Sequence, residues 1–134
     1  MKVIVCVDKK GGMMFNNRRQ SQDRVLREKI AEILNGAALY MNSYSAKQFK
    51  GECSITVDEE FLSVAGKDDF CFVENLNVTP DTVNEFYIFN WNRKYPADFY
   101  FDIKPRELGF KPIKTEEFQG SSHEKITLEV FAKV

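Results

Sequence analysis

The polar residues best suited to chemistry lie near the N-terminus, where Arg18 and Arg19 come just before the first stretch with helical spacing. Cations beside a helix N-terminus suit a phosphate or a carboxylate, because guanidinium groups and free backbone N–H groups both attract oxyanions. A solvated basic loop is the simpler interpretation of the same pair. Arg18 and Arg19 are therefore candidate ligand-binding residues, with a solvated loop as the alternative.

A second cluster, residues 90–95, interleaves aromatic side chains with cations, as in Trp91-Asn92-Arg93. Such a pattern could stack on a base or on the side chain of a partner protein. The net charge of −1 and the sequence pI near 5.9 do not favour nucleic acid. Protein contact, or anchoring of Trp91 in the core, is the stronger interpretation, and Trp91 is also a candidate ligand-binding residue.

The chain has one histidine, His123, in a polar loop near the C-terminus. An exposed loop histidine is the simple interpretation, and a general acid or base is the alternative. A zinc hydrolase needs several clustered histidines, so this class is close to excluded. No Gly-x-Ser-x-Gly motif is present, and no cysteine has a partner that the sequence reveals, so nothing points to nucleophilic catalysis.

The composition is that of a globular protein with one domain over residues 1–134. The apolar content is 43%, no stretch is long enough to cross a membrane, and the first apolar run ends at Asp8, too early for a signal peptide. Three isolated cysteines without Cys-x-x-Cys spacing indicate buried thiols in a reducing compartment. We therefore expect a cytoplasmic protein that binds neither membranes nor nucleic acid.

The elements that must position these residues are a buried strand and an amphipathic helix. Residues 3–7 are all apolar, which is typical of a strand buried on both faces. Residues 23–34 repeat apolar side chains at helical spacing, with Ser21 as the expected cap and Asn35 as the expected stop. Ligands of α/β proteins bind at the carboxyl ends of strands, so the loop 8–22 is the predicted site.

The rest of the chain alternates short strands with short helices. The sequence predicts strands at residues 37–41, 53–57, 70–73, 86–89, 99–103, 110–118 and 125–132, and helical turns at 46–49 and 80–85. Residues 59–65 fit either a short helix or a loop. This order predicts an α/β fold with one mixed, mostly parallel sheet, flanking helices and a C-terminal antiparallel hairpin.

With this order, the chain resembles dihydrofolate reductase in a shortened form. The likeness rests on the first strand, loop and helix, on the second strand with its following helix, and on the closing strands; the segments are Gly11-Gly12-Met13-Met14-Phe15-Asn16, residues 39–49, residues 97–101 and residues 115–130. In this family an acidic residue in the first turn of the first helix binds the pterin and helps to protonate it. Asp23 falls at this position, so the resemblance implies that Asp23 is catalytic; capping of the helix is the alternative.

The sequence departs from the family where the cofactor NADPH would bind. The family holds the phosphates of NADPH with a Gly-Arg-Lys/Arg-Thr turn, and the matching turn here, Asn42-Ser43-Tyr44-Ser45, contains no cation. The family also has a Gly-Gly pair after its fifth strand, where this chain has Asn90-Trp91-Asn92-Arg93. A side chain at that point fills space that the phosphates need.

Three hypotheses follow. The first is a protein that binds a small pterin-like or nucleotide-like molecule around Asp23, Arg18, Arg19, Tyr44 and Trp91 and has lost its dinucleotide site. The second is a working NADPH-dependent reductase, for which NADPH would be the cofactor. The third is a non-enzymatic protein, such as a homodimer, that self-associates through aromatic strands near Trp91 and Tyr100.

Overall fold

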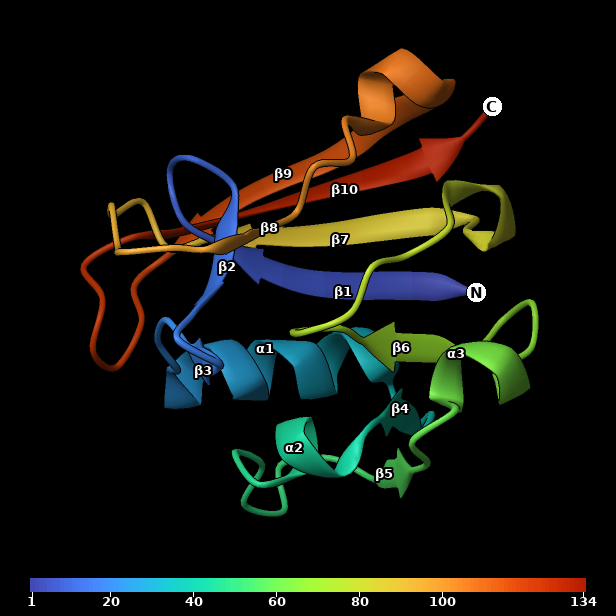
Figure 1. Ribbon diagram of the computed structural model, residues 1–134, viewed down its shortest axis with the longest axis horizontal. Helices are drawn as coiled ribbons and strands as arrows, with labels where there is room; N and C mark the ends of the chain where they lie inside the picture. The colour runs from blue at the N-terminus through green and yellow to red at the C-terminus, as the bar shows by residue number, and fades with distance from the viewer.

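The computed structural model describes residues 1–134 and is built around one seven-stranded sheet (Figure 1). The strand order is β5-β4-β6-β1-β7-β10-β9, from Ile55–Val57, Leu39–Met41, Phe70–Phe72, Lys2–Val7, Glu85–Asn90, Ile126–Lys133 and Phe110–Phe118. The five strands from β5 to β7 run parallel, and β10 and β9 form the antiparallel hairpin. The predicted mixed, mostly parallel sheet is confirmed.

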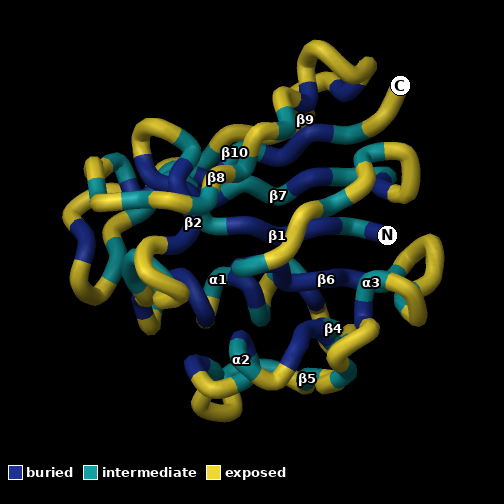
Figure 2. The backbone as a smooth tube through the Cα atoms, viewed as in Figure 1, coloured by how far each residue is buried: buried dark blue, intermediate teal, exposed yellow.

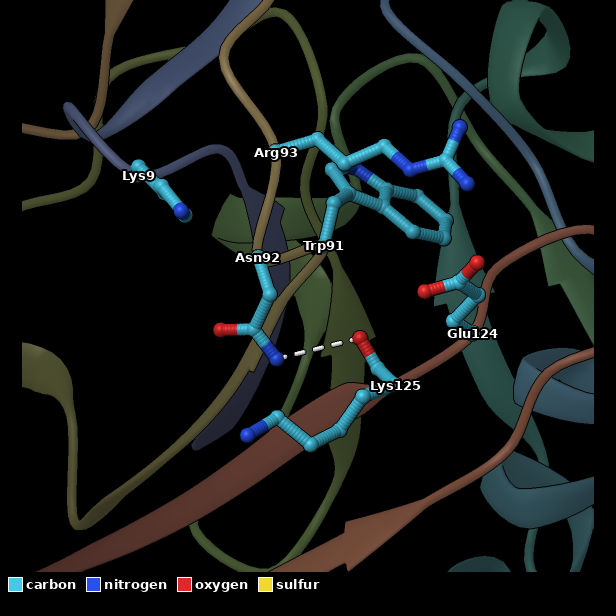
Figure 3. Close-up of a pocket in the computed structure, with 6 residues that line it drawn as sticks. All are labelled: Lys9, Trp91, Asn92, Arg93, Glu124 and Lys125. Atoms are coloured by element: carbon cyan, nitrogen blue, oxygen red, sulfur yellow. Dashed lines mark hydrogen bonds between the residues drawn. The ribbon is translucent and has the colours of Figure 1, made fainter.

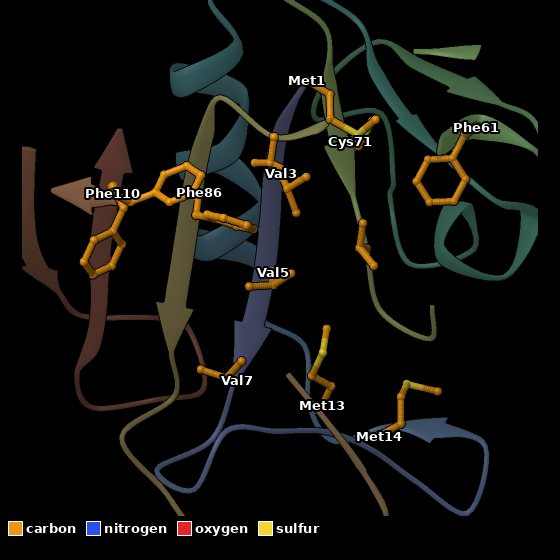
Figure 4. Close-up of a cluster of buried hydrophobic side chains, with 13 residues drawn as sticks. Met1, Val3, Val5, Val7, Met13, Met14, Phe61, Cys71, Phe86 and Phe110 are labelled. Atoms are coloured by element: carbon orange, nitrogen blue, oxygen red, sulfur yellow. The ribbon is translucent and has the colours of Figure 1, made fainter. Parts of the chain in front are cut away.

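The first strand is buried on both faces, as its apolar run predicted. Val3, Val5 and Val7 belong to one core cluster, and Ile4 belongs to the cluster on the opposite face. Figure 4 shows the first cluster along β1, with Phe86 and Phe110 on one side and Phe61 on the other. The central position of β1 explains its apolar sequence, because both faces of a central parallel strand are covered by other parts of the protein.

Helix α1, Arg24–Leu34, covers the face of the sheet that carries Ile4. Its buried side chains Leu26, Ile30 and Leu34 follow the predicted helical spacing, and each adds roughly 1.5–3 kcal/mol of hydrophobic stabilisation. The predicted cap at Ser21 is wrong: the N-cap is Asp23, which accepts hydrogen bonds from the backbone N–H groups of Val25 and Leu26. Asn35, in the left-handed conformation with φ of 47°, ends the helix.

The other helices are short. They are α2 (Ser43–Ala46), α3 (Phe61–Val64) and two 3-10 turns, η1 (Pro80–Thr82) and η2 (Pro105–Leu108). The helical turn predicted at 46–49 lies three residues too late, because Asn42 caps α2 by accepting from the N–H of Ser45. The opposite face of the sheet is covered mainly by connecting segments, one of which crosses in front of β1 between β6 and β7 (Figure 1).

Residues 8–22 were predicted as a loop, but part of this segment forms strands. It holds the hairpin β2 (Gly12–Phe15) and β3 (Arg18–Arg19), and β2 also pairs with β8 (Phe99–Tyr100) in a separate three-stranded sheet. Asn16 and Asn17, with φ of 53° and 61°, form the hairpin turn, since asparagine tolerates positive φ. The predicted strand 99–103 is therefore shorter and does not join the main sheet.

Figure 2 shows that β1, β7 and β10 consist of buried and intermediate residues, except at the end of β10, and that most exposed residues lie in the connecting segments and outer strands. The small sheet lies beside the carboxyl end of β1, where the site was predicted (Figure 1). No helix is both long enough and apolar enough to cross a membrane.

Candidate functional site

Asp8, the first residue after β1, organises the loop at the carboxyl edge of the sheet. One oxygen accepts from the N–H groups of Lys10 and Gly12, both at 2.8 Å, and the other accepts from Gln20 Nε2 at 3.0 Å and Tyr95 N at 3.2 Å. Burial raises the pKa of this carboxyl, but the donors outweigh burial and hold the pKa below its usual value. Asp8 is therefore a structural carboxylate with both oxygens engaged.

A partly buried ion pair joins the hairpin to the segment just after β6. Arg19 Nε and Nη2 bind the two oxygens of Glu74 at 3.0 and 3.1 Å, in the two-pronged geometry that favours arginine. The backbone N–H of Arg19 donates to the Tyr44 hydroxyl at 2.8 Å, and its guanidinium lies 4.6 Å from the Tyr44 ring centre. The predicted ligand-binding residues Arg19 and Tyr44 thus touch each other, and Arg19 in turn is paired with Glu74.

Glu74 is also the acceptor for helix α2 and the residues just after it. Ser45 Oγ donates to Glu74 at 2.8 Å and Gln48 Nε2 donates at 3.0 Å, so each oxygen of Glu74 has two donors. Ser45 and Gln48 are themselves buried. The turn 42–45 therefore directs the Ser45 hydroxyl into the protein, toward the carboxylate of Glu74.

Asp23 joins the start of α1 to the loop 120–123. Its Oδ1 accepts from the N–H groups of Val25, Leu26 and Ser121, and its Oδ2 accepts from Ser122 N, Ser122 Oγ and His123 Nδ1. Burial raises the pKa of Asp23, but the donors led by the Ser122 N–H lower it far below its usual value. With six donors and 2% exposure, neither oxygen is open to a pterin. The catalytic role of Asp23 stays a prediction, and helix capping is observed.

His123 is not an exposed loop histidine, which corrects the simple interpretation. Only 2% of its side chain is exposed, and Nδ1 lies 2.9 Å from Asp23 Oδ2. Nε2 lies 3.0 Å from Ser21 Oγ and 3.1 Å from the Tyr95 hydroxyl. The ring stacks on Trp91 with 4.4 Å between the ring centres. Folding therefore buries the only histidine among polar groups from two distant segments, residues 21–23 and Tyr95.

Trp91 is an internal residue at the carboxyl end of β7. It is 3% exposed and packs in the core cluster beneath α1, and its backbone N–H donates to Val7 O at 2.9 Å. Anchoring of Trp91 in the core is confirmed. Trp91 itself offers little surface to a partner, whereas Tyr100 is 47% exposed, so self-association through the aromatic strands near Trp91 and Tyr100 stays a prediction.

A cavity of about 290 Å³ opens beside Trp91, at the carboxyl ends of β1 and β7 and the start of β10. Its lining consists of Lys9, Trp91, Asn92, Arg93, Glu124 and Lys125. Figure 3 shows the cationic side chains coming from three different segments, while Asn92 Nδ2 donates to the backbone oxygen of Lys125 at 3.0 Å. Lys9, Arg93 and Lys125 face one lining carboxylate, Glu124, and the ammonium of Lys125 is paired with Glu117 at 2.9 Å. The cavity therefore keeps a net positive charge of one in a protein whose net charge is −1.

Arg18 lies on a different cavity, of about 350 Å³, between the β2–β3 hairpin and the segment 95–96. Its lining consists of Phe15, Asn16, Arg18, Arg19, Gln20, Tyr95 and Pro96. Gln20 Oε1 is the one buried side-chain oxygen without a hydrogen-bond partner. Arg18 itself is exposed, in agreement with the solvated-loop alternative.

The five predicted site residues therefore fall into three places. Arg19 contacts Tyr44, Asp23 and Trp91 both contact His123, and Arg18 lies exposed on the cavity that Arg19 also lines. Asp8 and Glu74 were not predicted as site residues, although Asp8 directly follows β1 and Glu74 is two residues beyond the end of β6, which was a usable signal. Arg93 belongs to the predicted cluster 90–95, but Lys9 and Lys125 were not predicted beside it, because nothing local to the sequence brings them together.

No protein-family profile matches the sequence, and no curated protein matches it. Solved structures do match. Dihydrofolate reductase from Enterococcus faecalis, in complex with NADP(H) and RAB-propyl, superimposes with a TM-score of 0.66 at 10% sequence identity, over 98% of this chain and 94% of that chain. This protein has a dihydrofolate reductase-like fold. The dihydrofolate reductase-like fold predicted from the order of elements is thus confirmed, and an identity of 10% carries the fold alone.

Proposed function

We propose that this protein binds a small anionic molecule with a planar ring, of nucleotide or pterin type, in the positive cavity beside Trp91. The observation that carries the proposal is the gathering of Lys9, Arg93 and Lys125 around the end of β7. Carboxyl ends of parallel strands are the usual ligand sites of α/β sheets, and cations there attract phosphate or carboxylate groups. The volume of about 290 Å³ lies at the lower end of ligand sites, which suits a mononucleotide better than a dinucleotide.

We further propose that NADPH is not the ligand, because the residues at the expected dinucleotide site do not fit it. The turn 42–45 supplies no cation, and Ser45 Oγ is engaged by Glu74. Glu74 is held in turn by Arg19, so the one arginine nearby is neutralised before any phosphate arrives. Trp91 fills the core after β7, where the resemblance requires glycine.

Fluorescence of Trp91 tests the proposal, because it is the only tryptophan in the chain. The probes are AMP, inorganic pyrophosphate, dihydrofolate and NADPH, each titrated at low and at high salt. We expect AMP or dihydrofolate to change the emission at micromolar concentration, with weaker binding at high salt because exposed cations are screened. No response to any probe would overturn the proposal.

Paired variants locate the response. Lys9→Ala with Lys125→Ala should weaken binding at least tenfold, and Lys67→Ala with Lys111→Ala removes two exposed lysines elsewhere and should leave binding unchanged. Tight binding of NADPH, together with consumption of NADPH in the presence of dihydrofolate, would instead support the reductase hypothesis and overturn the closed dinucleotide site.

A further inference from the structure

Three side chains that the proposed ligand site does not use are arranged in line. Ser21 Oγ lies 3.0 Å from His123 Nε2, and His123 Nδ1 lies 2.9 Å from Asp23 Oδ2. Nucleophile, base and carboxylate in this order, each within hydrogen-bond distance, form the geometry that activates a serine. Ser21 and His123 are 102 residues apart, so no sequence motif announces the arrangement.

The protonation of the ring follows from its neighbours. Nδ1 lies 2.9 Å from the Asp23 carboxylate and 3.1 Å from the Ser122 hydroxyl, which itself donates to Asp23. The carboxylate can only accept, so the proton of the neutral imidazole lies on Nδ1. Nε2 is then an acceptor, and it faces two hydroxyls that can donate, those of Ser21 and Tyr95. Nε2 is therefore placed to take the proton of Ser21.

The surroundings hold this alignment in place. The side chain of Asp23 is fully buried and receives four backbone N–H bonds, and the imidazole is stacked on Trp91 at 4.4 Å. Gly120 lies so close to Asp23 that a β-carbon there would stand within 2.9 Å of both carboxylate oxygens. Ser21 is partly exposed, so the nucleophile can be reached while base and carboxylate stay dry.

A substrate has room next to these residues. The 350 Å³ cavity is lined by Gln20, the neighbour of Ser21 in the chain, and by Tyr95, which shares His123 Nε2. The partnerless Gln20 Oε1 is a buried acceptor that an N–H group of a ligand could satisfy. This cavity is distinct from the positive cavity, with which it shares no lining residue.

We propose that Ser21 is a catalytic nucleophile toward small carboxylic esters that carry an N–H donor, with His123 as general base and Asp23 as a positioning residue. Ser21 Oγ attacks the ester carbonyl carbon as its proton passes to His123 Nε2. The alkoxide then leaves and takes this proton. Water, deprotonated by His123, cleaves the acyl-serine and releases the acid, and Ser21 regains its proton.

A fluorophosphonate tests the proposal, because an activated serine displaces fluoride and gains a stable phosphonyl group. We expect the folded protein to gain one such group by intact mass, mapped to Ser21. Ser21→Ala should abolish labelling, whereas Ser43→Ala removes an exposed serine elsewhere and should label like the parent. Failure to label, or labelling that Ser21→Ala leaves intact, would overturn the proposal.

Two further variants examine the base. Tyr95→Phe removes the competing hydroxyl on His123 Nε2 and should label at least as fast as the parent; loss of labelling in a folded Tyr95→Phe protein would contradict the assigned hydrogen bonds. Asp23→Asn, checked for folding by circular dichroism, should be labelled at least about 10³-fold more slowly than the parent. The Trp91 response to AMP should survive in Ser21→Ala, which separates this proposal from the ligand site.

Discussion

Replacing Asp23 by asparagine tests how the start of α1 is joined to the loop 120–123. The amide oxygen of asparagine can keep the three N–H donors that now bind Oδ1. The amide nitrogen then faces Ser122 N, Ser122 Oγ and His123 Nδ1, which now donate to Oδ2. A hydroxyl can turn and an imidazole can change tautomer, but the N–H of Ser122 cannot, so it is left without an acceptor.

The loss of stability from this substitution has two contributions. An unsatisfied buried donor costs about 1–3 kcal/mol, and the remaining bonds lose the strengthening that a charged acceptor gives. We expect Asp23→Asn to lower the free energy of unfolding by about 2–4 kcal/mol at pH 7, measured by urea denaturation. As a control, Asp81→Asn replaces an exposed aspartate in η1 and should change the free energy of unfolding by less than about 0.5 kcal/mol.

The pH dependence gives a second measurement. The donors hold the folded-state pKa of Asp23 well below its unfolded value of about 3.9. Its contribution is therefore fully present above about pH 4–5 and is lost as the pH falls through the folded-state pKa. The parent should lose stability more steeply than Asp23→Asn below about pH 4, so the two curves should converge. Equal stability at pH 7, or parallel curves in acid, would refute this account of Asp23.

Three other substitutions or measurements test the surrounding structure. Glu74→Gln leaves the guanidinium of Arg19 without its carboxylate and should cost about 2 kcal/mol or more in urea denaturation; a neutral result would show that the ion pair does not stabilise the hairpin. Gly12→Ala places a β-carbon 2.6 Å from a neighbouring alanine β-carbon and should destabilise by about 1–3 kcal/mol, while Gly66→Ala, with 3.3 Å to its nearest atom, should cost less. Burial raises the pKa of Cys71 to about 11, so iodoacetamide at pH 8 should alkylate it only on unfolding, which intact mass would detect; rapid labelling of the native protein would contradict its burial.

Much of the fold could be predicted because its signals are local. Residues 3–7 are all apolar, which predicts a buried strand, and residues 23–34 repeat apolar side chains at helical spacing, which predicts an amphipathic helix. The small sheet was missed because β3 and β8 have only two residues each, too few for a period to show. The turn Asn16-Asn17 was the available signal for the hairpin, since asparagine pairs favour positive φ.

The site was less predictable, because its contacts join residues far apart in the chain. Arg19 and Tyr44 were predicted from their chemistry, but only the tertiary structure shows that the guanidinium of Arg19 is paired with Glu74. The burial of His123 could not be read from its polar neighbours, because Trp91 and Asp23 reach it from segments 32 and about 100 residues away.

The sequence by itself determined the central buried strand, the covering helix and the mixed sheet, since each depends on the order of apolar and polar residues along a short segment. The tertiary structure alone decided which carboxylates are saturated, that Trp91 and His123 stack, and that Lys9, Arg93 and Lys125 surround one cavity. The reason is physical: secondary structure follows from neighbours along the chain, whereas the charge and hydrogen bonds of a site depend on neighbours in space.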